Sequence, residues 1–425
     1  MTVDLDTLLN QFSQKIKEDV GLPFLWMRQN LAFVEKNINV LQTKSKNPVA
    51  YALLINFLLI KNDSLQASHH IYLFQKEHPK DVLSQMLLAL HYLKTEQLKL
   101  AYNALNQILN VQNSYYVWEL LLDCTLKLKW HDAGVALSQK AQKSGAWKEE
   151  IMLNFLDYEA YFHHHNFNFD KSIALRNEQF RRFINLKSFT SAQTEEQKFN
   201  TSSAWQSLID ILYLLKINNI IAFPVAGTLL GLHREGKLLD FDKDLDIGVM
   251  PDEDLAAVKQ ILEKNPRYEL SVNVPAFTSY VSFIDKNNGC TIDILKFRKN
   301  RGYFELSWMP PKPYQQMSRI LRYTPFTLSA KTFNNVTMYV PDDTDLFLQE
   351  IYGEWKTPDP HYFSILSQNL VAYTKLAQSA TYFHLFRYLN LGNYKKALII
   401  IKRAEELGDT NDIFSSLKKR AENLC

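Results

Sequence analysis

The sequence is poor in cysteine, in net charge and in long apolar runs, and each shortage excludes a class of protein. Its three cysteines stand far apart in 425 residues. Without Cys-x-x-Cys spacing, they argue against both a disulfide scaffold and a zinc site. The formal net charge of +3 is small for this length and gives no indication of a nucleic-acid partner. The longest apolar run, residues 51–60, is too short to cross a bilayer.

The N-terminal residues are acidic and amphipathic, and no basic segment precedes an apolar one, so no signal peptide is predicted. We therefore expect a cytoplasmic protein without a transmembrane segment. Peripheral attachment at the inner face of the membrane stays open. Apolar residues make up 46% of the chain and aromatic residues 13%. This composition indicates a globular protein, and the length allows two or three domains.

Residues 1–187 are predicted to be α-helical, because apolar residues recur there at three- and four-residue spacing and glycine and proline are scarce. Ala101 follows Ala67 by 34 residues, the period of a tetratricopeptide repeat, and Asp132-Ala133 offers a looser third copy. These segments predict degenerate tetratricopeptide-like hairpins. Such a stack of helices commonly holds a protein partner. The alternative is a helical bundle that extends the core of the remaining chain.

The composition divides the rest of the chain into three parts. Residues 188–204 turn to serine, threonine, glutamine and glutamate and are predicted to be a linker. Residues 205–372 alternate helical and strand patterns and are predicted to form a second domain, which the motifs described below make the candidate catalytic domain. Residues 373–425 return to a tetratricopeptide-like helical hairpin. The predicted fold class is therefore α+β, with a mixed β-sheet core flanked by helical repeats.

One stretch of the middle segment carries a pair of acids on a predicted strand. Asp244 and Asp246 alternate with Leu245 and Ile247, so the two carboxylates face one way while the apolar side chains face a core. Two neighbouring carboxylates repel each other, and a site that keeps both ionised usually holds a cation. Oxygen ligands with room for phosphate suit Mg²⁺ or Mn²⁺.

The residues before the acid pair suggest a phosphate-binding element. A short strand over residues 220–225 is followed by a predicted turn at Gly227-Thr228 and by one or two helical turns that reach Arg234. Gly227 allows close approach of the backbone to a ligand, and a helix that opens at Thr228 presents N–H groups to it. Arg234 is a forked donor suited to another phosphate oxygen.

A third acid, Asp293, lies between Ile292 and Ile294 on a later predicted strand. An acid between isoleucines is costly to bury without a partner, and a metal ion shared with the acid pair would supply one. Asp293 is thus the third predicted catalytic and metal-binding residue, and it is also a candidate general base for an acceptor hydroxyl.

Taken together, these motifs resemble the LicD/fukutin family of phosphotransferases, which has a nucleotidyltransferase fold. The resemblance rests on residues 227–231, Arg234, residues 244–248, Asp293 and the segment 341–358, and it extends over roughly residues 205–360. It implies transfer of an alcohol phosphate, such as phosphocholine, ribitol phosphate or glycerol phosphate, from a CDP-activated donor. The acceptor would be a hydroxyl of a cell-surface glycan or of a lipid-linked precursor, and CMP would be released.

Other functions stay open at this point. An Asp-x-Asp pair also holds the metal of many glycosyltransferases that use nucleotide sugars. A template-free nucleotidyltransferase acting on RNA or protein is a further alternative, although no basic, aromatic-interleaved stretch supports RNA binding. The last alternative is a non-catalytic scaffold of helical repeats.

Overall fold

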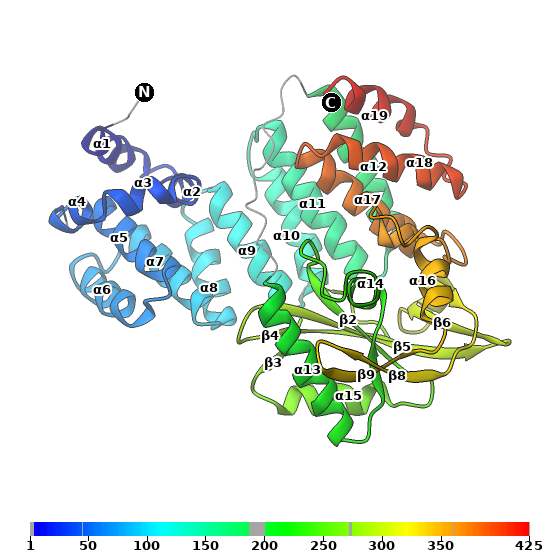
Figure 1. Cartoon of the computed structure of the whole chain (residues 1–425). Helices are drawn as coiled ribbons and strands as arrows, with labels where there is room; N and C mark the ends of the chain where they lie inside the picture. The colour runs from blue at the N-terminus through cyan, green and yellow to red at the C-terminus, as the bar shows by residue number, and fades with distance from the viewer. Residues whose placement is uncertain (1–3, 45, 187–199, 272–273, 360, 425) are drawn as a thin grey trace. The chain divides into compact units, whose positions relative to one another are not determined.

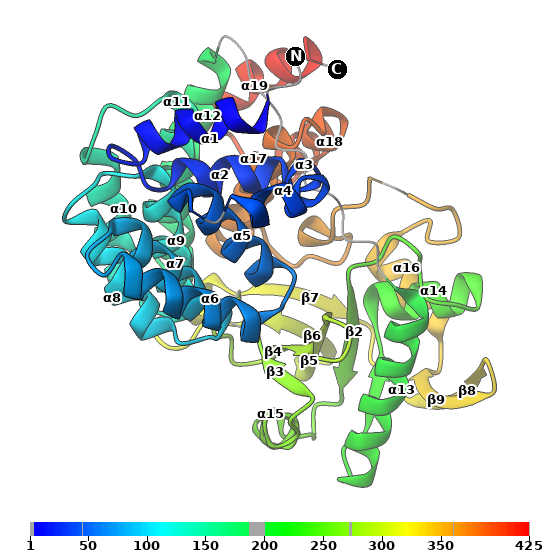
Figure 2. The same cartoon turned by 90° about the vertical axis from the view of Figure 1, so that its left-hand side faces the viewer.

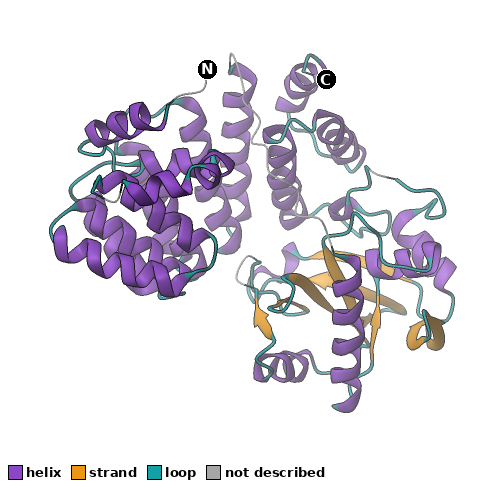
Figure 3. Cartoon of the chain, turned by 60° about the vertical axis from the view of Figure 1, so that its left-hand side comes forward, coloured by secondary structure: helices purple, strands orange, loops and turns teal. Residues whose placement is uncertain are grey.

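In the computed structural model, the chain divides into two compact units, residues 1–162 and 163–425 (Figure 1). The structure describes residues 4–44, 46–186, 200–271, 274–359 and 361–424. Among these residues, no helix has the length and apolar character needed to span a membrane. The predicted α+β class is confirmed, since helices flank a mixed β-sheet (Figure 3).

The first unit is helical. Its helices are α1 (Leu5–Lys15), α2 (Leu22–Gln29), α3 (Leu31–Lys36), α4 (Ile38–Thr43), α5 (Pro48–Ile60), α6 (Ser64–Glu77), α7 (Val82–Lys94), α8 (Leu98–Leu109), α9 (Tyr115–Lys127), α10 (His131–Lys143) and most of α11 (Glu149–His165). Polar N-caps fix several of the starts. For example, Asn47 accepts hydrogen bonds from the first turn of α5, and Pro48 occupies its first position.

Helix pairs in this unit repeat with the period seen in the sequence. Helices α6, α8 and α10 begin at residues 64, 98 and 131, at intervals of 34 and 33 residues. Their buried small residues are Ala67, Ala101 and Gly134. A Cβ atom on Gly134 would lie 2.4 Å from the Phe162 ring, so the helices pack where side chains are short. The spacing agrees with tetratricopeptide-like hairpins, whose identity and partner stay predictions.

The second unit combines a β-sheet with helices. Its strands are β1 (Ala222–Pro224), β2 (Asp244–Val249), β3 (Tyr268–Leu270), β4 (Tyr280–Asp285), β5 (Cys290–Asn300), β6 (Tyr303–Trp308), β7 (Arg319–Tyr323), β8 (Leu328–Phe333) and β9 (Val336–Pro341). Its helices are α12 (Phe169–Asn185), α13 (Thr201–Ile217), α14 (Ala226–Glu235), α15 (Leu255–Lys264), α16 (Thr344–Tyr352), α17 (Lys375–Asn390), α18 (Tyr394–Glu406) and α19 (Ile413–Glu422), with short 3₁₀ turns at Tyr314–Met317 and Ser364–Leu366.

The sheet is mixed, in the order β1-β2-β5-β4-β3. Strand β6 pairs with the second half of β5 and with β7, and β8 and β9 form a separate hairpin. Strands β2 and β5 are parallel, whereas the other pairs are antiparallel. Asn334 and Asn335 form the turn of the β8–β9 hairpin with φ angles of 47° and 64°, as the tightest hairpin turns require.

The two faces of the sheet differ. On one face, Asp285 accepts a hydrogen bond of 2.7 Å from Ser207 of α13, so α13 covers that face. Ser282 pairs in register with Asp293, and alternation turns Ser282 away from Asp285. The acid side chains of β2 and β5 therefore lie on the face that α13 does not cover.

The boundary between the compact units lies at Phe162–His163, not at residue 187. Helix α12, expected with the N-terminal repeats, instead packs against the C-terminal helices. Its Phe180 meets Tyr382 of α17 edge to face, with ring centroids 5.5 Å apart. The predicted segments 205–372 and 373–425 thus share one unit. Most of the predicted linker lies outside the described residues, and its last residues, from Thr201, already belong to α13.

Candidate active site

Strands β2 and β5 bring the three predicted acids to one face of the sheet. The strands run parallel, and Asp246 pairs in register with Asp293. Adjacent strands are about 4.8 Å apart, so these two residues are direct neighbours. Asp244 lies two residues before Asp246 on the same face. Leu245 and Ile247 point the other way and are fully buried in the core, as the alternation predicts.

The start of α14 holds Asp246 in place. Ala226 has a left-handed φ of 42°, an uncommon conformation for a residue with a Cβ atom. It turns the chain sharply from strand to helix. The N–H of Gly227 then donates to Asp246 Oδ2 at 3.2 Å. The hydroxyl of Thr228, which is fully buried, accepts the backbone N–H of Asp246 at 2.8 Å.

This arrangement corrects the predicted turn at Gly227-Thr228. The helix already begins at Ala226, so both residues belong to its first turn. The Gly227 N–H and the Thr228 hydroxyl are directed to Asp246 rather than to open space. In this conformation they position a carboxylate, and their contact with phosphate stays a prediction.

A fourth acid, Asp242, belongs to the cluster and was not predicted. A Cβ atom added to Gly227 would lie 2.8 Å from Asp242 Oδ2, so the glycine leaves room for this carboxylate. Burial and the charge of Asp244 raise the pKa of Asp242 to about 7. The signal in the sequence is the alternation of aspartates at positions 240, 242, 244 and 246. Of these, Asp240 is exposed and pairs with Lys237 at 2.7 Å.

The acids on this face make one another harder to ionise. Burial, and then the charges of Asp244, Asp242 and Asp293, raise the pKa of Asp246 well above its ordinary value, against the opposing effect of the Gly227 N–H. Burial also raises the pKa of Asp244, which the nearby charge of Lys243 lowers. Burial and the charge of Asp244 raise the pKa of Asp293. The positive charge of Lys243 therefore offsets the burial and mutual repulsion of these acids only in part.

The carboxyl group of Asp293 has one buried oxygen atom without a partner. Its Oδ1 atom is buried and makes no hydrogen bond, and the neighbouring Ser282 hydroxyl is also without one. Ser282 and Tyr280 of β4 lie beside the carboxyl group and lower its pKa, but less than burial raises it. A buried carboxylate oxygen without a partner is costly, so this atom is free to bind a ligand.

Helix α16 and the residues after it border the acids. Burial, followed by the charges of Tyr362, Asp246 and Asp242, raises the pKa of Tyr352 well above its ordinary value. Figure 2 shows α14 and α16 next to each other beside β2. Trp355, in the residues after α16, is buried.

Arg234, predicted to bind phosphate, connects α14 to this segment. Its Nη1 donates to the carbonyl of Trp355 at 3.2 Å, and its Nη2 donates to Glu235 at 2.9 Å. The Nε atom is buried and makes no hydrogen bond. Its role as a phosphate ligand stays a prediction.

The donor set fits a divalent ion in its chemistry. It consists of carboxylate oxygens that repel one another, with the unpaired Asp293 Oδ1 among them, and such oxygens are preferred by Mg²⁺ and Mn²⁺. However, within the described ranges no three aspartate, glutamate, histidine or cysteine side chains already surround a common point as the ligands of one ion do. The structure therefore shows a cluster of acids on one face but not a closed ion site.

Comparison with known proteins agrees with the motifs. Residues 219–343 match the family model "LicD/FKTN/FKRP, nucleotidyltransferase domain", which includes β1, α14, β2 and β5. The chain is similar to an uncharacterized protein of Rickettsia typhi, with 28% identity over 195 residues, and to one of Rickettsia prowazekii, with 27% identity over 153 residues. These alignments cover 44% and 36% of this chain, and 58% and 55% of the respective relatives. The chain thus spans somewhat more than half the length of each relative.

Proposed function

Residues 219–343 match the model of the LicD/FKTN/FKRP nucleotidyltransferase domain, and from this similarity we propose that the chain is a metal-dependent phosphotransferase. It moves an alcohol phosphate, such as phosphocholine, ribitol phosphate or glycerol phosphate, from a CDP-activated donor. The acceptor is a hydroxyl of a cell-surface glycan or of its lipid-linked precursor. The observation that carries the proposal is the pairing of Asp246 with Asp293 on parallel strands, with Asp244 on the same face.

Asp244, Asp246 and Asp293 would hold a Mg²⁺ or Mn²⁺ ion. When bound, the ion supplies charge neutralisation for the donor's phosphates and for the departing CMP. The protein contributes the rigidity of this site. Because Asp246 is fixed through its carboxylate by Gly227 and through its backbone N–H by Thr228, little reorganisation is needed when substrate binds.

The transfer forms a bond between the acceptor oxygen and the phosphorus of the alcohol phosphate and breaks the bond from that phosphorus to the oxygen that leaves with CMP. The acceptor hydroxyl must lose a proton in this step. We assign the proton to Asp293 or to one of its neighbouring acids, because its free Oδ1 and its raised pKa suit a general base. If a neighbouring acid takes the proton, Asp293 serves only as a ligand of the ion. We propose that Arg234 contacts the donor's phosphates and that Gly227 and Thr228 border them while keeping their hydrogen bonds to Asp246.

A donor panel tests the proposal. The full chain is incubated with Mg²⁺, with an oligosaccharide or lipid-linked acceptor fraction, and with CDP-choline, CDP-ribitol or CDP-glycerol, and CMP release is measured. We expect release with one donor, loss of release in EDTA, and loss in Asp244→Ala, with Asp240→Ala as the matched control. Turnover of a UDP-sugar without turnover of any CDP-alcohol would favour a glycosyltransferase instead. An Asp244→Ala protein with normal activity would contradict the site assignment.

A further inference from the structure

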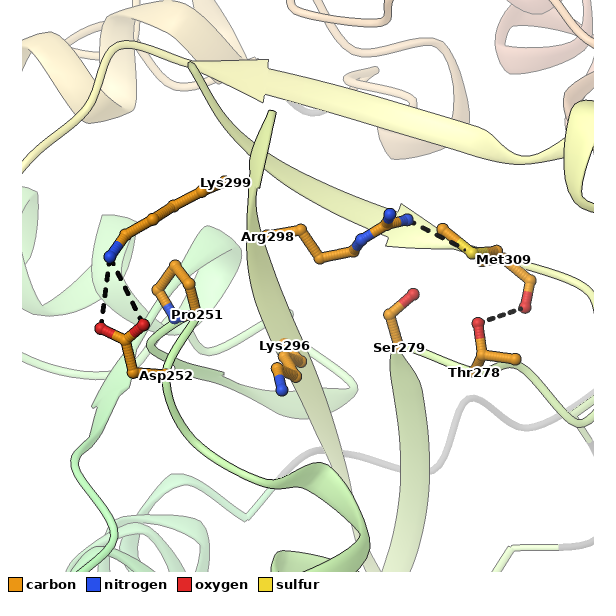
Figure 4. A pocket seen from close by; sticks show the side chains of 8 residues that line it. All are labelled: Pro251, Asp252, Thr278, Ser279, Lys296, Arg298, Lys299 and Met309. Atoms are coloured by element: carbon orange, nitrogen blue, oxygen red, sulfur yellow. Dashed lines mark hydrogen bonds and ion pairs between the residues drawn. The ribbon is translucent and has the colours of Figure 1, made fainter. Parts of the chain in front are cut away.

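A pocket of about 430 Å³ opens where β2 and β5 end, and Lys296, Arg298, Lys299, Asp252, Ser279 and Met309 are among the residues that line it (Figure 4). We propose that this pocket binds a phosphate-bearing ligand of about monosaccharide size, at a site separate from the carboxylates. The inference goes beyond the proposed transfer reaction and does not depend on it.

The pocket lies on the opposite face of the sheet from the acids. Asp293 faces the side that carries Asp246, and alternation along β5 turns Lys296 and Arg298 to the other side. Strand pairing supports this placement, because Lys296 is in register with Val249, whose side chain alternates away from Asp246. A ligand held by these two cations is therefore separated from the candidate active site by the sheet itself.

Two of the pocket's cations make no ion pair with any described residue. Among the described residues, Lys296 has no salt bridge, and the guanidinium of Arg298 makes one hydrogen bond, from Nη1 to the thioether of Met309 at 3.3 Å. Glu305 pairs in register with Arg298, yet its carboxylate is bound by Arg322 at 2.8 Å instead. The acid nearest along the sheet is thus already neutralised by another residue, and Arg298 remains available.

The remaining charges leave an excess that matches a phosphate group. Lys299 extends toward Asp252, with Nζ 3.3 Å from its carboxylate, whereas Arg298 extends toward Met309 on the other side of the strand (Figure 4). The charges of Lys299 and Asp252 cancel, and Lys296 and Arg298 leave a net charge of +2 in the lining, equal and opposite to that of a phosphomonoester dianion. Arginine suits such a group because its guanidinium donates two parallel hydrogen bonds.

The hydroxyls of the pocket are already engaged, so the cations carry the recognition. The Ser279 hydroxyl donates to the carbonyl of Ser307 at 2.9 Å, and the Thr278 hydroxyl donates to the carbonyl of Met309 at 3.2 Å. The volume lies in the lower part of the range of small-molecule sites, roughly 300–1,000 Å³. A sugar phosphate, free or at the end of a glycan, fits this size and charge.

Calorimetric titration of the full chain with glucose 6-phosphate in EDTA and low salt tests the proposal. We expect saturable binding that weakens at least tenfold in Lys296→Gln/Arg298→Gln. The control Lys395→Gln/Lys402→Gln removes the same charge from exposed positions of α18 and should bind as the unmodified protein does. Asp252→Asn, which removes the anion of the pocket, should tighten binding.

Inorganic phosphate provides a second arm. Binding as tight as that of the sugar phosphate assigns recognition to the phosphate alone, and weaker binding assigns a contribution to the sugar; either result supports the site. No saturable binding by the unmodified protein, an unchanged affinity in Lys296→Gln/Arg298→Gln, or an equal loss in the control would overturn the proposal. Asp246→Asn should leave this binding intact, so failure of the transfer reaction and failure of the pocket are distinguishable.

Discussion

Removing one acid from the cluster should stabilise the metal-free protein. In Asp246→Asn, the amide oxygen still accepts the Gly227 N–H that now reaches Oδ2, whereas the repulsion between Asp246 and its neighbours is removed. Two carboxylates about 5 Å apart, as on adjacent strands, repel by about 3 kcal/mol at an effective dielectric constant of about 20. Because partial protonation already relieves some of this repulsion, we expect the free energy of unfolding of the variant to be higher by about 1–3 kcal/mol.

The increase in stability is measured as the difference between the midpoints of thermal unfolding of the variant and of the unmodified protein. Both are recorded in EDTA at pH 8, where the carboxylates of the unmodified protein ionise most. For a unit of this size, about 1 kcal/mol shifts the midpoint by roughly 2–4 °C, so we expect an increase of roughly 2–12 °C. Added Mg²⁺ should raise the midpoint of the unmodified protein and not that of the variant. Asp240→Asn is the matched control, since Asp240 is exposed and pairs only with Lys237. A midpoint that falls in Asp246→Asn, or rises equally in the control, would refute this account of the cluster.

Three further changes test the scaffold around the acids. Gly227→Ala should keep the fold but reduce turnover about tenfold or more, as measured by CMP release, because its Cβ would lie 2.8 Å from Asp242 Oδ2 and must displace that carboxylate; unchanged turnover would contradict this role. Thr228→Val should lower the free energy of unfolding by about 1–3 kcal/mol in urea titration, since a buried N–H of β2 loses its acceptor; a change below about 0.5 kcal/mol would be inconsistent with it. Asp285→Asn should cost about 3 kcal/mol at pH 7, because Arg267 would lose a buried partner at 2.6 Å. Burial opposes ionisation of Asp285, but hydrogen bonds led by that of Arg267 outweigh it and hold the pKa of Asp285 below the ordinary value. The contribution of Asp285 to the free energy of unfolding is therefore present above about pH 4 and is lost as the pH falls through the lowered pKa. A difference in stability between the two proteins that persists at pH 2 would contradict this assignment.

The sequence predicts the parts of the site that depend on local alternation. Asp246 and Asp293 each stand between apolar residues of a strand, Asp244 opens β2 just before Leu245, and the structure brings all three acids to one face. Residues 304–308 also alternate apolar and polar side chains, and they belong to β6.

The parts that depend on tertiary contacts were not predictable in the same way. Gly227-Thr228 is typical of a turn, but the left-handed φ of Ala226 starts the helix earlier. Asp242 joins the cluster only because Gly227 leaves it room. The unit boundary at Phe162 follows from the packing of α12 against α17, whose residues are about two hundred positions away in sequence. No local pattern contains that contact.

The central claim is that the acids of β2 and β5 bind one divalent ion. Titration of the full chain with Mn²⁺, followed by electron paramagnetic resonance of the free ion, tests it directly. We predict one ion per chain, displaced by Mg²⁺, with binding lost in Asp246→Asn and in Asp293→Asn and retained in Asp240→Asn. Equal Mn²⁺ binding by all three variants would contradict the claim.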